Sequence, residues 1–369
     1  MQSYLVTLKP LEPYFFGGER TFHYGTETTM PDTYYIASEK TPNQTALLGT
    51  LRYAILDRYG LLWHSGETDV ERTLRAHSGD YVGESGFSID GNNRFGLIER
   101  ISPLFLRRGE TSYLPAPLNY RIVDEKDGGC LRFATLPSSA AENRAPVNYK
   151  AKGHDLPAGK YLPVCEKTGE PVDPFLSNVR VGIDTKEKKD GFFKKQYQML
   201  KSGFCFAFYA SLDERADVDG YTGTVFMGQG KSPFQIAFRR EEDDLETLAK
   251  QLLPREENDY WYALSDLWFR EKPEHEGFAI LLRKQLRYLT TDLDSGTQRN
   301  RMNKTAELYN LVQAGSVFYY DPMKLHRQQS ADRKGQNAAC GEEGEKVTFL
   351  RRNVDCVGMN RLIHIEARK

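Results

Sequence analysis

Short apolar runs separated by polar or glycine-rich segments recur along the chain and indicate β-strands. Residues 4–8 alternate loosely between apolar and polar positions, which is typical of a half-buried strand. The β-branched run at 179–183 and the apolar run at 204–209 indicate two more strands, and residues 223–238 predict a strand, a glycine-rich turn and a strand. Further strands are expected at 97–107, 131–134, 261–269, 314–320 and 361–365.

One segment, residues 42–56, has a helical period instead. Its apolar residues recur at helical spacing, at Leu47, Leu48, Leu51, Ala54 and Ile55. Thr41 is a natural N-cap and Pro42 a natural first helical residue. We also expect one short helix within the polar segment 64–96, and a strand leading into a short helix over 277–290. Residues 137–178 and 326–346 are predicted to be loops.

This order of elements predicts an α+β fold with antiparallel sheets rather than a doubly wound parallel sheet. A chain of 369 residues with 39% hydrophobic residues is long enough for two domains with real cores. The 50 basic residues nearly cancel the 51 acidic ones, so nucleic-acid binding would have to come from local patches.

Cysteine usage and hydropathy restrict the cellular setting. The five cysteines, Cys130, Cys165, Cys205, Cys340 and Cys356, are scattered and form no CxxC pair. We therefore expect neither a zinc site nor a disulfide framework, and no cofactor. The amino-terminal residues do not form a signal peptide, and no apolar run is long enough for a membrane span. These features predict a reduced, cytoplasmic protein.

The stretch 179–201 combines six lysines with aromatic residues. It passes from the strand into a polar loop centred on Asp190-Gly191, so with the run at 204–209 we expect a hairpin over about 179–209. Lysines offer charge to phosphates and aromatic faces offer stacking to unpaired bases, which suits single-stranded RNA. The alternative is a solvated loop whose aromatics fold onto the core. The candidate RNA contacts are Lys186, Lys188, Lys189, Phe192, Phe193, Lys194, Lys195 and Tyr197.

Two glycine-rich turns are further candidates for phosphate contacts. Gly17-Gly18 allows close approach of a ligand to the backbone, where Arg20 would meet a phosphate. In the second turn, Gly228 and Gly230 precede Lys231, and backbone amides there suit an anion. The Walker spacing is absent because residue 225 is valine and a strand follows, so we reject an NTPase.

Five segments resemble, in order, the third-subunit family of the Cmr complex, the type III-B CRISPR effector. They are residues 15–22, 41–52, 181–184, 228–232 and 314–318. The wider likeness is to the repeat-associated "RAMP" superfamily, which also includes the fourth Csm subunit and the Cas-five group. The sequence departs from the usual pattern at Gly18-Glu19 and at Asp184-Thr185-Lys186.

The resemblance implies two ferredoxin-like (RRM-like) domains, residues 1–215 and 216–369, with long insertions and a projecting basic thumb hairpin. It also implies binding of the 5′ tag of a CRISPR RNA (crRNA), with the large polymerase-like Cmr subunit and the backbone subunits as partners. In this interpretation the chain is not an enzyme. Asn43, Gln44 and Arg52 would line the tag pocket with Arg20, since amides read base edges and arginine grips phosphate.

Two other functions compete with this interpretation. Related superfamily members cut repeat RNA without a metal by using a histidine base, and His23 is the candidate here; a lone histidine among aromatics is more often a packed or surface residue. The third possibility is a pure protein scaffold in which the lysine loop docks an acidic neighbour. Cleavage of repeat RNA would favour the nuclease, and salt-dependent binding to protein but not RNA would favour the scaffold.

Overall fold

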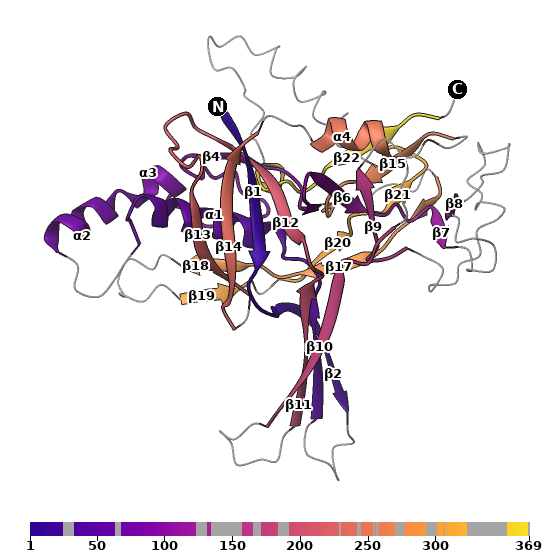
Figure 1. Cartoon of the computed structure of the whole chain (residues 1–369), viewed down its shortest axis with the longest axis horizontal. Helices are drawn as coiled ribbons and strands as arrows, with labels where there is room; N and C mark the ends of the chain where they lie inside the picture. Colours follow the sequence, from indigo (N-terminus) through magenta and orange to yellow (C-terminus); the bar gives the residue numbers. More distant parts are fainter. Residues whose placement is uncertain are drawn as a thin grey trace, which may run out of the picture.

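The computed structural model describes residues 1–24, 33–62, 68–122, 131–133, 157–164, 171–183, 192–228, 230–241, 245–253, 255, 258–269, 277–292, 301–305, 307–322 and 353–367. Within these residues the chain forms mostly antiparallel sheets with few helices (Figure 1). The predicted α+β class is therefore confirmed. None of the helices in these ranges is both long enough and apolar enough to cross a membrane.

The body is organised on an eight-stranded sheet in which β1 (Gln2–Pro10) pairs with β12 and β14 on its two sides. The strand order is β13-β14-β1-β12-β5-β6-β9, and β4 also pairs with β12. The other strands are β4 (Ile98–Ile101), β5 (Phe105–Arg108), β6 (Thr111–Pro115), β9 (Tyr161–Val164), β12 (Phe204–Leu212), β13 (Thr222–Met227) and β14 (Ser232–Arg240). Because β14 pairs with β1, this sheet includes strands on both sides of residue 215.

Alternation along β1 sends its side chains into two separate cores. Tyr4, Val6 and Leu8 join the apolar face of helix α1 (Gln44–Arg58), whereas Leu5 joins a second core on the opposite face of the sheet. The second core contains α4 (Leu245–Leu252) and a four-stranded sheet in the order β16-β21-β15-β22. These strands are β15 (Tyr260–Ala263), β16 (Ala279–Ile280), β21 (Val317–Phe318) and β22 (Leu362–Ile365). Layers on both faces explain why so much of this sheet is apolar.

A second four-stranded sheet, in the order β10-β11-β3-β2, extends away from the body, and we call it the arm (Figure 1). It consists of β2 (Phe16–Tyr24), β3 (Thr33–Glu39), β10 (Phe175–Ile183) and β11 (Phe192–Leu200). β2 pairs with β3 and β10 with β11, both antiparallel, and β11 joins the two pairs through a parallel register with β3. Two chain segments about 150 residues apart therefore share one projection.

The remaining elements are short. The pairs β17 (Arg283–Leu286) with β20 (Tyr309–Val312), β18 (Leu289–Asp292) with β19 (Arg301–Lys304), and β7 (Tyr120–Ile122) with β8 (Leu131–Phe133) form two-stranded sheets. The helices α2 (Asp69–Ala76), α3 (Ser78–Val82) and α6 (Asn353–Cys356) complete the described elements.

Several predicted elements are wrong in detail. The strand that returns from the lysine loop is β11 and not the run at 204–209, which is the central strand β12. Residues 277–290 form short strands without a helix, residues 64–96 contain two short helices, and the strand at 261–269 ends at Ala263. The N-cap of α1 is Asn43 rather than Thr41. The predicted loop at 326–346 lies outside the described residues.

Candidate nucleic-acid interface

The base of the arm carries a cluster of cations and aromatic rings. Tyr197 on β11 packs edge-on against Phe15, with ring centroids 5.5 Å apart. The Arg180 guanidinium lies 4.6 Å from the centre of the Tyr197 ring, and Lys195 Nζ lies 5.6 Å from the centre of the Phe15 ring. Phe15 is only 1% exposed. Tyr197 is partly exposed and is therefore the ring of this pair that a base can reach.

Arg180 and Lys195 are direct cross-strand partners in the β10–β11 register. Directly opposite residues on antiparallel strands project to the same face, so the two cationic side chains share one face of the arm. The pair is thus a suitable place for a phosphate group.

The glycine-rich turn between β13 and β14 contacts the start of the arm. Gly228 has a φ of +76°, and a Cβ at this position would lie 2.3 Å from the Phe15 carbonyl oxygen. Only glycine combines this backbone conformation with so close an approach. Gly230 has a φ of +110°, and the exposed Lys231, at a φ of +54°, follows in the turn. The fold therefore brings the two predicted glycine segments together, with Lys231 in the turn.

Other predicted residues of the arm are placed only by their backbone. Gly17 pairs with Ser38, and the β2–β3 register shifts between Gly17 and Thr21. A Cβ on Gly18 would lie 2.9 Å from Glu39 Oε1. Arg20 and His23 lie in β2 and Phe192 and Phe193 in β11, while their side chains are outside the described set. Lys194 is exposed on β11, and Lys186, Lys188 and Lys189 fall outside the described residues.

Helix α1 and its N-cap, which carry the predicted tag-pocket residues Asn43, Gln44 and Arg52, lie in the body and not on the arm (Figure 1). Gln44 is 7% exposed, and its Nε2 donates hydrogen bonds to the carbonyl oxygens of Ser102 and Val357. These bonds hold the start of α1 to two distant parts of the chain. The carbonyl group of Asn43 accepts the first hydrogen bond of the helix, and its side-chain Oδ1 is buried without a partner.

Arg52 also makes contacts within the body. Its guanidinium lies 4.9 Å from the centre of the Phe95 ring and donates to the Ser85 carbonyl oxygen at 2.7 Å. Burial lowers the pKa of the Arg52 guanidinium to about 10, so the group remains charged at neutral pH. These contacts give Arg52 a packing role, because its guanidinium is buried and already lies against a ring face.

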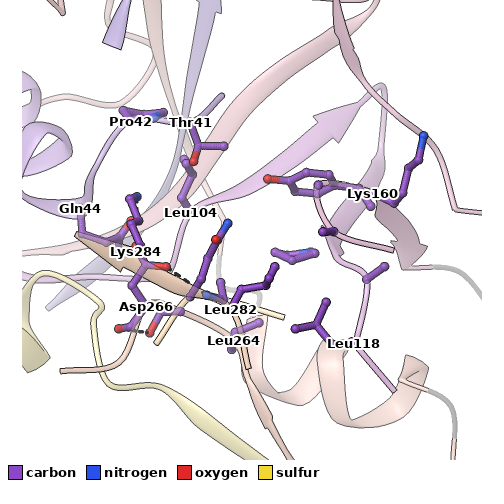
Figure 2. A pocket seen from close by; sticks show the side chains of 18 residues that line it. Thr41, Pro42, Gln44, Leu104, Leu118, Lys160, Leu264, Asp266, Leu282 and Lys284 are labelled. Atoms are coloured by element: carbon purple, nitrogen blue, oxygen red, sulfur yellow. Dashed lines mark hydrogen bonds and ion pairs between the residues drawn. The ribbon is translucent and has the colours of Figure 1, made fainter. Parts of the chain in front are cut away.

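A cavity of about 70 Å³ lies between α1, β6 and the carboxyl-terminal half (Figure 2). Gln44 and Lys160 line it together with Asp266, Lys284 and Ala314. The Asp266 carboxylate is 3.2 Å from Lys284 Nζ and accepts a hydrogen bond from the Ala314 backbone amide at 3.0 Å. Sequence reasoning missed this ion pair. The sequence pointed to this region only through the segment at 314–318, whose Ala314 amide the Asp266 carboxylate binds.

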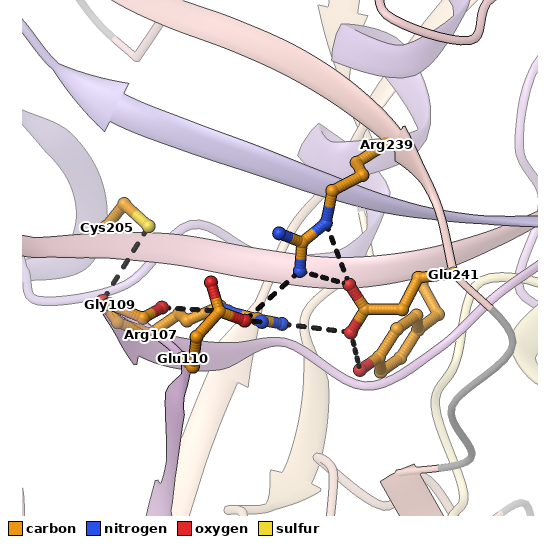
Figure 3. Close-up of polar contacts among 7 residues, drawn as sticks. Arg107, Gly109, Glu110, Cys205, Arg239 and Glu241 are labelled. Atoms are coloured by element: carbon orange, nitrogen blue, oxygen red, sulfur yellow. Dashed lines mark hydrogen bonds and ion pairs between the residues drawn. The ribbon is translucent and has the colours of Figure 1, made fainter.

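A second ion network joins β5 to the end of β14 (Figure 3). The Arg107 side chain, 8% exposed, pairs with Glu110 and with Glu241 at 3.1 Å, and Arg239 pairs with both glutamates. Burial raises the pKa of Glu241, but hydrogen bonds from Arg239 and Arg107 outweigh it, so the pKa lies below its ordinary value. Because the two arginines and two glutamates balance in charge, this network serves to join strands rather than to bind an anion.

Metal ligands do not gather in the described part of the chain. No group of three or more His, Cys, Asp or Glu side chains there could hold a metal ion. The base of the arm offers cationic groups and ring surfaces, which suit the binding of a nucleic acid.

A family model described as CRISPR-associated protein (Cas_Cmr3) matches residues 6–344. No curated protein matches the chain. A cryo-EM structure of the type III-B Cmr-beta complex bound to cognate target RNA contains a chain with 13% identity and a TM-score of 0.44, covering 97% of this chain and 96% of that one. A crystal structure of a Csm1–Csm4 cassette with AMPPNP gives 15% identity, a TM-score of 0.33 and coverage of 87% and 89%.

Proposed function

The chain belongs to the Cas_Cmr3 family of CRISPR-associated proteins, and from this membership we propose that it is a non-catalytic RNA-binding subunit of a type III-B effector complex. It caps the crRNA and recognises its 5′ tag, and it docks the large polymerase-like subunit beside the backbone subunits. Two ferredoxin-like domains form its framework. In support of a ferredoxin-like unit, the sheet has the order β14-β1-β12-β5 with α1 following β1. Because β14 lies beyond residue 215, this unit extends past the first domain predicted from the sequence.

The observation that carries this proposal is the cross-strand pair of Arg180 and Lys195 beside the Tyr197 ring. Two adjacent cations and a partly exposed ring fit a phosphate and its neighbouring base in single-stranded RNA. Lys231, in the turn that contacts Phe15, extends the cationic surface toward the body. Lys186, Lys188 and Lys189 remain predicted RNA contacts outside the described residues.

The test measures fluorescence anisotropy of the full chain with labelled crRNA, with and without the 5′ tag, over a series of salt concentrations. We expect tighter binding to the tagged RNA. Arg180→Gln and Lys195→Gln should each weaken binding by about fivefold and reduce the salt slope by about 0.7, the value for one lost phosphate contact on a single strand. Arg283→Gln, an exposed strand arginine on β17, is the matched control and should leave both quantities unchanged.

Equal affinity for tagged and untagged RNA would remove tag recognition from the proposal. Full affinity in both arm variants would remove the arm from the RNA site. A gel of the same reactions tests for cleavage, and RNA cut by the wild type but not by His23→Ala would replace the binding role with a nuclease.

A further inference from the structure

β10 is the outermost strand of the arm, and its free edge is open to solvent. Its one paired neighbour in the described part of the chain is β11. Every residue from Leu176 to Val181 is exposed. An edge strand presents a row of backbone donors and acceptors that can pair with another strand.

This edge has few of the usual protections against such pairing, and Arg180 is its one charged residue. β10 is nine residues long and contains neither lysine nor proline, and its register with β11 runs without a bulge. Leu176, Val179 and Val181 are 45%, 51% and 62% exposed, and Met199 on β11 is 39% exposed. Proteins normally shorten, charge or cover an edge strand of this kind. We therefore expect another strand to cover the free edge of β10.

The two faces of the strand differ in chemistry. Arg180 lies on the face of Tyr197 and Lys195, which carries the proposed RNA contacts. Val179 and Val181 alternate to the opposite face, where Val179 pairs with Gln196 and Val181 pairs with the exposed Lys194. RNA on the cationic face would leave the free edge and the two valines uncovered.

We propose that another protein subunit of the same complex adds an extended strand to the free edge of β10. The added strand would carry β-branched residues beside Val179 and Val181 and an acidic residue on the same face to complement Lys194. These contacts bury apolar surface and complement charge, and they leave Arg180 to the RNA. A second copy of this chain fits poorly, since edge-to-edge pairing would bring Arg180, Lys194 and Lys195 of both arms together. The inference rests on the proposed membership of an effector complex.

The first measurement compares hydrogen exchange of the β10 amides in the purified chain and in the complex assembled with its other protein subunits but without RNA. We expect exchange at residues 176–181 to slow by at least about tenfold on assembly, as strand pairing protects edge amides. Unchanged exchange would overturn the inference, and this measurement needs no variant that might misfold.

The second measurement uses the double variant Val179→Gln/Val181→Gln, which removes the apolar surface without changing charge. We expect its incorporation into the co-expressed complex, quantified by native mass spectrometry, to fall about tenfold, while RNA affinity of the isolated chain stays within about twofold. Val70→Gln on α2 is the control, since Val70 is 70% exposed and lies in the body.

Normal incorporation of the double variant overturns the inference and leaves the proposed RNA function intact. Lost RNA affinity with normal incorporation would assign the edge to RNA and also overturn it. Concentration-dependent dimers of the wild type that the double variant abolishes would assign the edge to a second copy. Wild-type chain that enters the complex but binds no RNA would refute the RNA function alone.

Discussion

The Asp266–Lys284 ion pair allows a quantitative test of what stabilises the carboxyl-terminal half of the chain. Both side chains are largely buried, at 16% and 11% exposure, and the contact is 3.2 Å. At that distance and an effective dielectric constant of about 20, the attraction is about 5 kcal/mol. Desolvation of the two charges offsets a large part of it, so we expect a net coupling of about 2 kcal/mol.

The perturbation is a double-mutant cycle of Asp266→Asn and Lys284→Met. Asp266→Asn keeps an acceptor for the Ala314 amide but leaves the ammonium group without its carboxylate, so we expect a loss of about 3 kcal/mol. Lys284→Met should cost about 1–2 kcal/mol, because the remaining carboxylate still accepts the Ala314 hydrogen bond. The double variant should cost less than the sum of the two.

The assay is urea unfolding followed by tryptophan fluorescence, since urea is uncharged and does not screen the pair. Trp268, near Asp266 in sequence, reports on this half of the chain. Arg58 and Asp217 form the control pair, at 2.7 Å but with 39% and 77% exposure, and exposed pairs couple by less than about 1 kcal/mol. A coupling at Asp266–Lys284 no larger than at the control pair would refute the reasoning.

Two further predictions concern stability. Gly228→Ala should lower the urea unfolding midpoint more than Gly60→Ala. Both glycines have positive φ, but a Cβ at Gly228 would meet the Phe15 carbonyl group, whereas a Cβ at Gly60 would have nothing within 4 Å. Equal losses would show that the turn at Gly228 moves to accommodate the added methyl group. Since the folded-state pKa of Glu241 is depressed, its stabilisation is present above the unfolded pKa of about 4.3 and is lost as pH falls through the folded pKa. Urea midpoints at pH 7 and pH 3.5 should therefore differ less in Glu241→Gln than in the wild type, and identical differences would contradict this.

The local pattern along the chain was enough to predict its class and its central elements. Alternation at 4–8 predicted β1, the leucine spacing at 42–56 predicted α1, and the glycine-rich turn at 223–238 predicted the β13–β14 pair. These signals are reliable because each element buries one face, and burial fixes the period of the apolar residues.

Pairing between distant segments was beyond the same reasoning. The run at 204–209 was the stronger strand signal after the lysine loop, because it is continuously apolar whereas residues 192–200 mix lysine and glutamine with apolar residues. The apolar face of β12 is buried by α1 and its neighbours in the central sheet, whereas β11 pairs in parallel with β3 in the arm. No local signal encodes a parallel contact across more than 150 residues.

For the candidate site, the sequence determined which residue types were available and the tertiary structure decided which of them meet. Lys195 and Tyr197 were predicted as RNA contacts from composition, but their partners Arg180 and Phe15 follow from strand register and ring packing alone. Gln44 was equally plausible as a base-reading amide, yet the fold buries it against Ser102 and Val357. The spacing of hydrophobic residues is a local property of the chain. The pairing of polar groups depends on the whole fold, because a buried polar group can bond only to the partners that packing brings within reach.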